Sequence, residues 1–544
     1  MSIFYNDPPA PEKKKEDVPI EFALMAGALA IGAVAYAKWH LIMRFYFRNF
    51  ETIWLSAYGA IALIAAVIIG VIVKRTKALT DRENLLGEVS DSFGSIFVGT
   101  THDGENLYLS EKDRCGHPQI MGSTGRGKTV SVVESWACRD ILALRNVILM
   151  DGKGDPGILK NIRRAAKKSI RRPDVFVFDL GNPKESCATN PLEFGSAQQI
   201  TDRIFTAFSF EDPYYRAVQY DVTGNIIELI KEIPGNTSEG EKPKAGVVTF
   251  RRIYECLTDD MALSQAIAES HNEVLRTKLT RFLATPKGLR EEKFSGLTSQ
   301  LAPFAVGEVA PLVNGPSEER PNAVSVSRIL LPSRHEEENR YQYVFVVLIP
   351  TLKYQQIGHQ LGKLILQEIG WAVGERASTK GELATFTPLF LDEFSAFVYE
   401  GFANILNKAR SSRVALHLSH QSQADLSLVS REFAQVITTN TNVKCILGLN
   451  DPESADFMAR HMGTETEEKT TEQAREWGLF PKREKTGAMS VREVEAYKIH
   501  PNLLKNYTNG RGVLHLPTRL GNVTEEIQFA RLSREELNEK GVEA

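Results

Sequence analysis

Cysteine is scarce in this chain of 544 residues, which has five cysteines and no C-x-x-C pair. The absence of paired cysteines argues against a zinc site and fits a reducing cytosol. A charge imbalance is also missing, because 65 lysines and arginines face 68 aspartates and glutamates. The surface as a whole is therefore not built to attract nucleic acid or anionic lipid, although a local channel could still do so.

A phosphate-binding pattern, G-x-x-x-x-G-K-[ST], lies between an expected strand over 118–121 and an expected helix over 129–142. Its residues, which we predict to bind the nucleotide, are Gly122, Ser123, Thr124, Gly125, Arg126, Gly127, Lys128 and Thr129. Glycines let backbone N–H groups curl around phosphate oxygens, and the helix N-terminus favours a bound anion. Lys128 can reach the β- and γ-phosphates, and the Thr129 hydroxyl can ligate Mg²⁺. A dinucleotide fingerprint is excluded, because it would need a glycine at Val130.

Hydrolysis also needs an acidic residue near Mg²⁺ and a group that positions water. Three apolar runs end in aspartate, at Asp151, Asp179 and Asp392, and only Asp392 is followed by a glutamate, Glu393. Asp392 could hold Mg²⁺ through water, while Glu393 could polarise the attacking water. Strand-end acids also cap loops, and for Asp151 and Asp179 that alternative stays open.

Two further polar groups flank the next apolar run, over 414–419. Gln421 follows the run and could sense the γ-phosphate, although most glutamines at strand ends only cap a loop. Arg410 and Arg413 precede it, and an arginine there could reach a neighbouring subunit's site and stabilise transition-state charge. From spacing alone, a solvated arginine is the alternative.

Apolar β-type runs recur along the chain after the phosphate-binding pattern, with helical patterns between several of them. Continuous apolar runs are typical of strands buried on both faces of a parallel sheet, so we predict a doubly wound α/β core. Residues 196–312 interrupt this rhythm with mostly helical spacing. We therefore expect 78–195 and 313–544 to be the two parts of a nucleotide-binding domain and 196–312 to be an inserted all-α domain. A hairpin is expected over 95–110, and a charged surface excursion over 464–489.

The N-terminal region contains two apolar segments. Residues 53–73 carry no charge and would span roughly 30 Å as a helix. Residues 22–37 are shorter, and Ala35-Tyr36-Ala37 also resembles the cleavage site of a signal peptide. We expect a flexible cytoplasmic tail over 1–19 and a two-helix transmembrane hairpin over 20–77, with the rest of the chain in the cytosol, where ATP is.

A basic face is expected after the phosphate-binding region, on a helix without acidic residues between 159 and 172. It consists of Lys160, Arg163, Arg164, Lys167, Lys168 and Arg171. Such a face could contact a phosphate backbone. An ordinary solvated outer helix is the alternative.

Taken in order, these features resemble the type IV secretion coupling proteins, the TraG/TraD-type ATPases of conjugation. Besides the phosphate-binding loop, the resemblance rests on Asp151-Gly152-Lys153-Gly154-Asp155, Asn190-Pro191-Leu192, Leu391-Asp392-Glu393-Phe394, Ala409-Arg410-Ser411-Ser412-Arg413, His420-Gln421-Ser422 and Asn450-Asp451-Pro452-Glu453-Ser454. Arg126 departs from the small residue usual at its place, and Asp155 stands where the family often has glutamate.

The resemblance implies a RecA-like P-loop NTPase core that bears an all-α domain, assembled as a homo-hexamer around a channel. It implies ATP hydrolysis with Mg²⁺, coupled to moving DNA, single-stranded or with a relaxase, through a type IV secretion channel. The expected location is the bacterial inner membrane, multi-pass, in contact with inner-membrane components of the secretion system. By motif match, Lys128, Glu393, Gln421 and Arg410 would be catalytic, and Thr129 and Asp392 would hold the metal.

Two other functions remain open from the sequence. The chain could be an ATP-dependent receptor for protein substrates of a secretion system, without DNA pumping, with the helical insertion as its binding module. It could also be a structural anchor that binds nucleotide and does not hydrolyse it.

Overall fold

A computed structural model describes residues 20–50, 58–74, 94–233, 246–317, 320–331, 342–378, 385–477, 482–518, 521–533 and 536. The chain divides into two compact units, one up to residue 84 and one from residue 85 onward. The predicted tail over 1–19 lies outside the described residues.

The first unit contains the helix α1 (Ile20–Arg48) and a second helix over 58–74. Among the residues described, no helix combines the length and the apolar character that a membrane crossing needs. This finding contradicts the predicted two-helix membrane anchor and the multi-pass inner-membrane location. The helix α1 is continuous, but Lys38 and Arg44 place charges within its apolar sequence. The described part of the second helix, residues 58–74, extends about 26 Å, less than the ~30 Å hydrocarbon core, and residues 53–57 of the expected span lie outside the described part.

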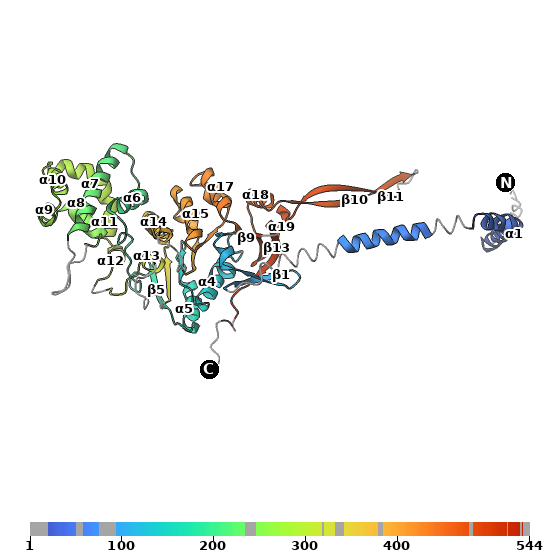
Figure 1. Cartoon of the computed structure of the whole chain (residues 1–544). Coiled ribbons are helices and arrows are strands. Elements are labelled where there is room, and N and C mark those ends of the chain that lie inside the picture. The colour runs from blue at the N-terminus through green and yellow to red at the C-terminus, as the bar shows by residue number, and fades with distance from the viewer. Residues whose placement is uncertain are drawn as a thin grey trace, which may run out of the picture. The chain divides into compact units, whose positions relative to one another are not determined.

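The second unit is built on a large sheet, drawn in Figure 1, with the strand order β2-β1-β13-β12-β9-β3-β8-β7-β4-β6-β5. The part from β9 to β5 is parallel, and β12, β13, β1 and β2 extend it in antiparallel fashion. The strands are β1 (Ile96–Thr101), β2 (Asn106–Leu109), β3 (Pro118–Met121), β4 (Val147–Asp151), β5 (Asp174–Asp179), β6 (Tyr343–Leu348), β7 (Thr387–Asp392), β8 (Val414–His420), β9 (Val443–Leu447), β12 (Arg511–Thr518) and β13 (Gly521–Phe529).

Helices cover both faces of the parallel part of this sheet, which explains why its inner strands β4, β6 and β7 are buried almost throughout. In β4, the side chains of Val147 and Leu149 join a core cluster with α4 (Glu134–Leu142) and α5 (Gly157–Lys168). The alternate residues, Ile148 and Met150, join a second cluster with α14 (Gln355–Ser378), α15 (Ala403–Ser411) and α17 (Arg431–Asn440). Successive side chains of a strand point to opposite faces, so one continuous apolar run serves two cores. The predicted α/β class is confirmed.

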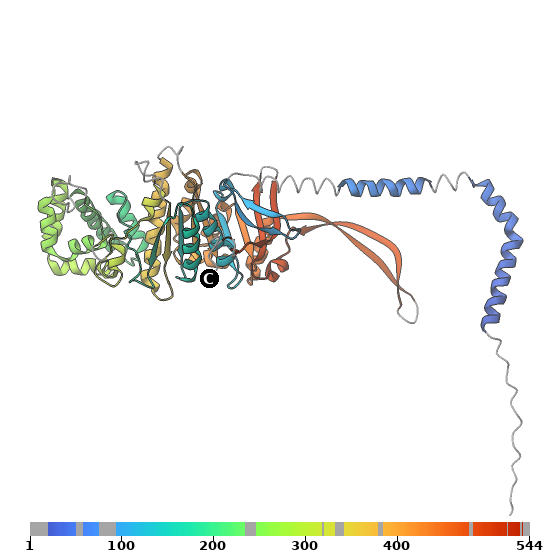
Figure 2. The same ribbon diagram turned by 90° about the horizontal axis from the view of Figure 1, so that it is seen from below.

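Helices fill the described chain between β5 and β6, apart from connecting loops. They are α6 (Ala197–Ala207), α7 (Pro213–Glu232), α8 (Phe250–Thr258), α9 (Asp260–Glu269), α10 (Glu273–Leu283), α11 (Lys287–Ala305), α12 (Ala310–Val313) and α13 (Val326–Leu330). Figures 1 and 2 show α7 to α11 gathered beside α6 and α14, at one end of this unit. The Asn272 side chain accepts from the backbone N–H of Leu275 and so starts α10 as a helix separate from α9. The domain boundaries at 195/196 and 312/313 stay predictions.

A long two-stranded ribbon projects from the other end of this unit, as Figure 2 shows. It consists of β10 (Thr464–Trp477) and β11 (Lys482–Tyr497), paired in antiparallel fashion from Thr464 opposite Tyr497 outward. It forms a sheet separate from the main one. The sequence predicts a charged surface excursion over 464–489 here, because this stretch is polar and only weakly patterned.

Candidate nucleotide-binding site

The phosphate-binding loop leaves the carboxyl end of β3 and enters a π-helical turn, η1 (Lys128–Val133), which continues into α4. Gly125 and Gly127 take φ values of +77° and +93°, which favour glycine. The Lys128 ammonium donates to the carbonyl oxygen of Gly122 at 2.6 Å, so the lysine closes the loop that it ends. Burial lowers the pKa of Lys128, although the carboxylates of Glu393 and Asp392 act in the opposite direction.

Two segments from later in the chain form hydrogen bonds with this loop. One precedes α18 (Pro452–Met462), and the other follows α19 (Pro501–Asn506). The backbone N–H of Ser123 donates to the carbonyl of Gly448 at 2.9 Å, next to β9. The Arg126 guanidinium donates to the carbonyl of Tyr507 at 3.0 Å and to the side-chain oxygen of Asn450 at 2.9 Å. The arginine that departs from the usual small residue therefore fastens the loop to a part of the chain more than 300 residues away.

Asp392, at the end of β7, contacts the threonine of the phosphate-binding loop. The Thr129 hydroxyl donates to Asp392 Oδ2 at 2.6 Å, and the Ser419 hydroxyl of β8 donates to Asp392 Oδ1 at 2.6 Å. A hydroxyl and a carboxylate oxygen side by side are hard oxygen donors that suit Mg²⁺. Asp392 also lies opposite Asp151 in the register of β7 and β4. Burial, and then the charge of Asp392, raise the pKa of Asp151 to about 6.

Glu393 follows Asp392 in a left-handed backbone conformation, with φ +50° and ψ +42°, which turns its side chain out of the strand direction. The Gln421 amide donates to its two carboxylate oxygens at 3.3 and 3.2 Å. The Thr124 hydroxyl donates to the Gln421 carbonyl oxygen at 2.9 Å. Gln421 therefore links the loop to the acid, and the structure brings Lys128, Thr129, Asp392, Glu393 and Gln421 to one edge of the sheet.

One residue at this edge received no role from the sequence. The Lys153 ammonium, in the turn after β4, lies 2.6 Å from Glu393 Oε1. Burial lowers the pKa of Lys153, but the hydrogen bond and the charge of Glu393 raise it overall. The available signal was its place between two glycines directly after a strand-end aspartate. Such a turn projects a side chain over the end of a parallel sheet.

The two other strand-end aspartates cap their own loops. Asp151 accepts the backbone N–H groups of Lys153 and Asp155 at 3.0 and 2.8 Å. Asp179 accepts those of Gly181 and Asn182 at 2.8 and 3.2 Å. Of the two alternatives that the sequence left open, the loop-capping arrangement is the one present in this structure.

Arg410 is not brought together with the other predicted catalytic residues. It lies exposed in the last turn of α15, which precedes β8, whereas Gln421 follows β8. The length of β8 therefore separates the two residues, about 20 Å at the usual rise of a strand. Arg413 pairs with Glu111 at 2.7 Å. A catalytic role for Arg410 stays a prediction, and it requires a second copy of the chain.

The predicted basic face lies on α5 and just after it. Ile158, Leu159 and Ile162 are buried beneath the helix, while the basic side chains point away from the core. The exposed residues of this face are Lys160, Arg163, Arg164, Lys167, Lys168 and Arg171. Lys168 donates to the carbonyl oxygen of Glu536 at 2.8 Å. The face is therefore amphipathic as predicted, and its role in binding stays a prediction.

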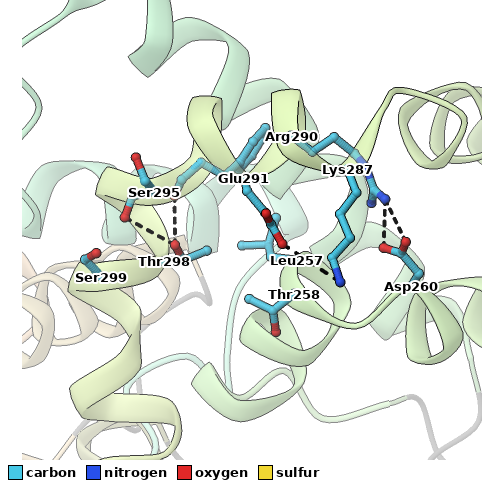
Figure 3. A pocket seen from close by; sticks show the side chains of 10 residues that line it. Leu257, Thr258, Asp260, Lys287, Arg290, Glu291, Ser295, Thr298 and Ser299 are labelled. Atoms are coloured by element: carbon cyan, nitrogen blue, oxygen red, sulfur yellow. Dashed lines mark hydrogen bonds and ion pairs between the residues drawn. The ribbon is translucent and has the colours of Figure 1, made fainter.

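A pocket of about 250 Å³ lies among the helices, between α8, α9 and α11. Figure 3 shows that its charged side chains are already engaged with each other. Arg290 pairs with Asp260 at 2.8 Å, and Lys287 lies 3.9 Å from Glu291. None of the predicted site residues lines this pocket.

Comparisons with known proteins agree with this architecture. A family described as the TraM recognition site of TraD and TraG matches residues 387–499, which include β7, β8, β9 and the ribbon. The type 4 coupling protein DotL of Legionella pneumophila subsp. pneumophila is 23% identical over 439 residues, covering 72% of this chain and 55% of DotL. The chain thus spans about half the length of this curated relative.

Solved structures show the same fold. The conjugative coupling protein TrwB, lacking its first 70 residues, matches with a TM-score of 0.54 and 13% identity over 82% of this chain and 92% of its own. TrwB in complex with ADP and Mg²⁺ matches with a TM-score of 0.52 and 13% identity, covering 84% and 95%. VirB4 of Thermoanaerobacter pseudethanolicus matches with a TM-score of 0.52 and 15% identity, covering 82% and 99%. The predicted resemblance to the type IV coupling proteins is confirmed, and the core has the fold of TrwB.

Proposed function

We propose that the protein is an ATPase that couples ATP hydrolysis to the recruitment and translocation of DNA, or of a nucleoprotein complex, through a type IV secretion channel. The observation that carries the proposal is the meeting of Lys128, Thr129, Asp392, Glu393 and Gln421 at one sheet edge. A phosphate-binding loop alone would bind nucleotide. A water-polarising glutamate held beside it adds the chemistry of hydrolysis.

Each residue has a definite task in this mechanism. The loop and the start of η1 point backbone N–H groups at the phosphates, and Lys128 supplies a positive charge from a buried position. Thr129 and Asp392 would hold Mg²⁺, which when bound neutralises phosphate charge. Glu393 takes a proton from the attacking water. Gln421 orients Glu393 and links it to the loop through Thr124.

A homo-hexamer is part of the proposal because of the place of Arg410. This arginine is exposed just before the amino end of β8, whereas the phosphate-binding loop lies at the carboxyl ends of the strands. It can contribute to hydrolysis only in a neighbouring subunit. Mixing Arg410→Ala protein with Glu393→Gln protein should then restore part of the activity that each variant lacks, because some sites combine an intact glutamate with an intact arginine. No recovery on mixing would refute action between subunits.

The main test is ATP hydrolysis by the full chain, with and without single-stranded and duplex DNA, at several salt concentrations. We expect hydrolysis to rise several-fold with DNA, and the stimulation to fall steeply with salt, because phosphate contacts release counterions. Glu393→Gln should abolish hydrolysis while nucleotide binding remains. Robust activity that ignores DNA at every salt concentration would refute the DNA role and leave the ATPase assignment standing.

A receptor for protein substrates is the second candidate, and one observation favours it. The matched family is described by its recognition of a protein, TraM, and the match includes the projecting ribbon. Replacing residues 467–494 by a short turn should leave the main sheet intact, since the ribbon forms a separate sheet. Loss of cargo-protein binding with unchanged DNA stimulation would favour the receptor.

A further inference from the structure

The ion pair between Lys153 and Glu393 occupies the group that would polarise water. Oε1 of Glu393 lies 2.6 Å from the Lys153 ammonium, while Gln421 donates to both carboxylate oxygens. A carboxylate that holds an ammonium this closely is a poorer acceptor for a water proton. Hydrolysis at this site therefore needs Lys153 to move away from Glu393.

The turn that carries Lys153 is fixed by its backbone rather than by its side chain. Both carboxylate oxygens of Asp151 accept backbone N–H groups from it, and the Gly152 N–H donates to the carbonyl of Asp392 at 3.1 Å. Gly154 takes φ +65°, and a Cβ there would lie 2.7 Å from the backbone nitrogen of Pro350. The lysine stem is thus anchored beside Asp392 while its end can rotate, since 47% of its side chain is exposed.

The charges around this ammonium favour an exchange of partners. The positive charge of Lys153 lowers the pKa of Lys128, so the two ammonium groups repel each other. A bound triphosphate would bring a terminal phosphate next to Lys128, and its charge would attract the second ammonium more strongly than one carboxylate does. A diphosphate has no such group. Glu393 would keep its place after the exchange, because Gln421 and Thr124 hold it independently of Lys153.

We propose that Lys153 is the residue that distinguishes ATP from ADP, by leaving Glu393 for the γ-phosphate and so freeing Glu393 Oε1 for the attacking water. The exchange makes and breaks no covalent bond. It rests on the proposed ATPase function and adds to it a specificity residue and the order of events. With ADP bound, Lys153 stays on Glu393 and the site remains inactive.

Lys153→Met tests this inference, because it removes the ammonium and keeps the stem. In the full chain, with Mg²⁺, we expect affinity for a non-hydrolysable ATP analogue to fall about tenfold or more, as for loss of a charged hydrogen bond. Affinity for ADP should not change, and Lys153→Arg should recover part of the loss. Lys278→Met is the matched control, since Lys278 is an exposed lysine of α10, among the helices between β5 and β6.

A second variant pair tests the exchange itself. Glu393→Gln removes the competing charge, so it should tighten binding of the ATP analogue, and this gain should vanish when Lys153→Met is also present. Equal effects of Lys153→Met on the analogue and on ADP, or no effect on either, would overturn the inference. Wild-type protein that bound neither nucleotide would instead refute the proposed function. Wild-type binding and hydrolysis with an unchanged analogue-to-ADP ratio in the variant would refute the inference alone.

Discussion

Substitution of Gly127 tests how the phosphate-binding loop is held, because a side chain at this position would lower the free energy of unfolding in two separate ways. Its φ of +93° lies in the left-handed region, where a residue with a Cβ costs about 1–2 kcal/mol. A Cβ would also lie 2.3 Å from the side-chain oxygen of Asn509 and 3.0 Å from the Ser131 hydroxyl. Relieving such crowding typically costs a further ~1–3 kcal/mol. Gly127→Ala should therefore lower the free energy of unfolding by about 2–5 kcal/mol.

Gly125 provides a control that separates the two costs. It belongs to the same loop and has φ +77°, but nothing lies within 4 Å of a Cβ placed there. Gly125→Ala should then lower the free energy of unfolding only through the left-handed backbone conformation, by about 1–2 kcal/mol. Adding Asn509→Ala to Gly127→Ala removes the nearest clash and should bring the double variant close to Gly125→Ala.

The measurements are urea unfolding followed by circular dichroism and, in parallel, ADP affinity. Since relieving the clash shifts a loop whose backbone N–H groups would bind phosphate, Gly127→Ala should also bind ADP more weakly than Gly125→Ala does. Equal stability of Gly127→Ala and Gly125→Ala would refute the reasoning. So would a double variant that is no more stable than Gly127→Ala, since the contact with Asn509 would then not exist.

Two further predictions concern buried charges. Burial raises the pKa of Glu368 to about 7 from an ordinary value of 4.5, so its stabilising contribution is complete below pH 4.5 and is lost as pH rises toward 7. Relative to Glu368→Gln, the wild-type protein should lose about 2 kcal/mol of unfolding free energy between pH 5.5 and pH 8, and a pH-independent difference in urea unfolding would contradict this. Asp140→Ala should cost about 3–5 kcal/mol in the same assay, because fully buried Asp140 accepts from Arg114 at 2.7 and 2.5 Å and from Arg145 at 2.8 Å. The control Glu111→Ala, at a partly exposed partner of Arg145, should cost about 1 kcal/mol or less, and equal losses would refute the prediction.

The ribbon of β10 and β11 and the C-terminal strands β12 and β13 are parts of the fold that the sequence did not predict. The parallel strands are predicted because they are continuous apolar runs, and inner strands such as β4 and β7 are buried throughout, whereas the edge strand β5 is only partly buried. The ribbon of β10 and β11 lies outside the main sheet and has no such run, so no hydrophobic period marks it. The strands β12 and β13 are absent from the prediction, and in β13 six of the nine residues are exposed or only partly buried, so no continuous apolar run marks it. The predicted membrane anchor is wrong for a different reason, because the amino-acid composition of a segment does not fix where its helix begins and ends.

By itself, the sequence determined the phosphate-binding loop, the acid pair and the α/β class, because each depends on residues that are neighbours in the chain. Backbone conformation at Gly125 and Gly127 and the alternating burial of a strand are local properties. The tertiary structure alone decided which strand-end acid meets Thr129, since that follows from the order β3-β8-β7-β4. It also decided that Lys153 pairs with Glu393, and that Arg410 lies near the amino end of β8, away from the phosphate-binding loop. These relations join residues up to about 260 positions apart, and only the packing of strands into one sheet fixes their distances.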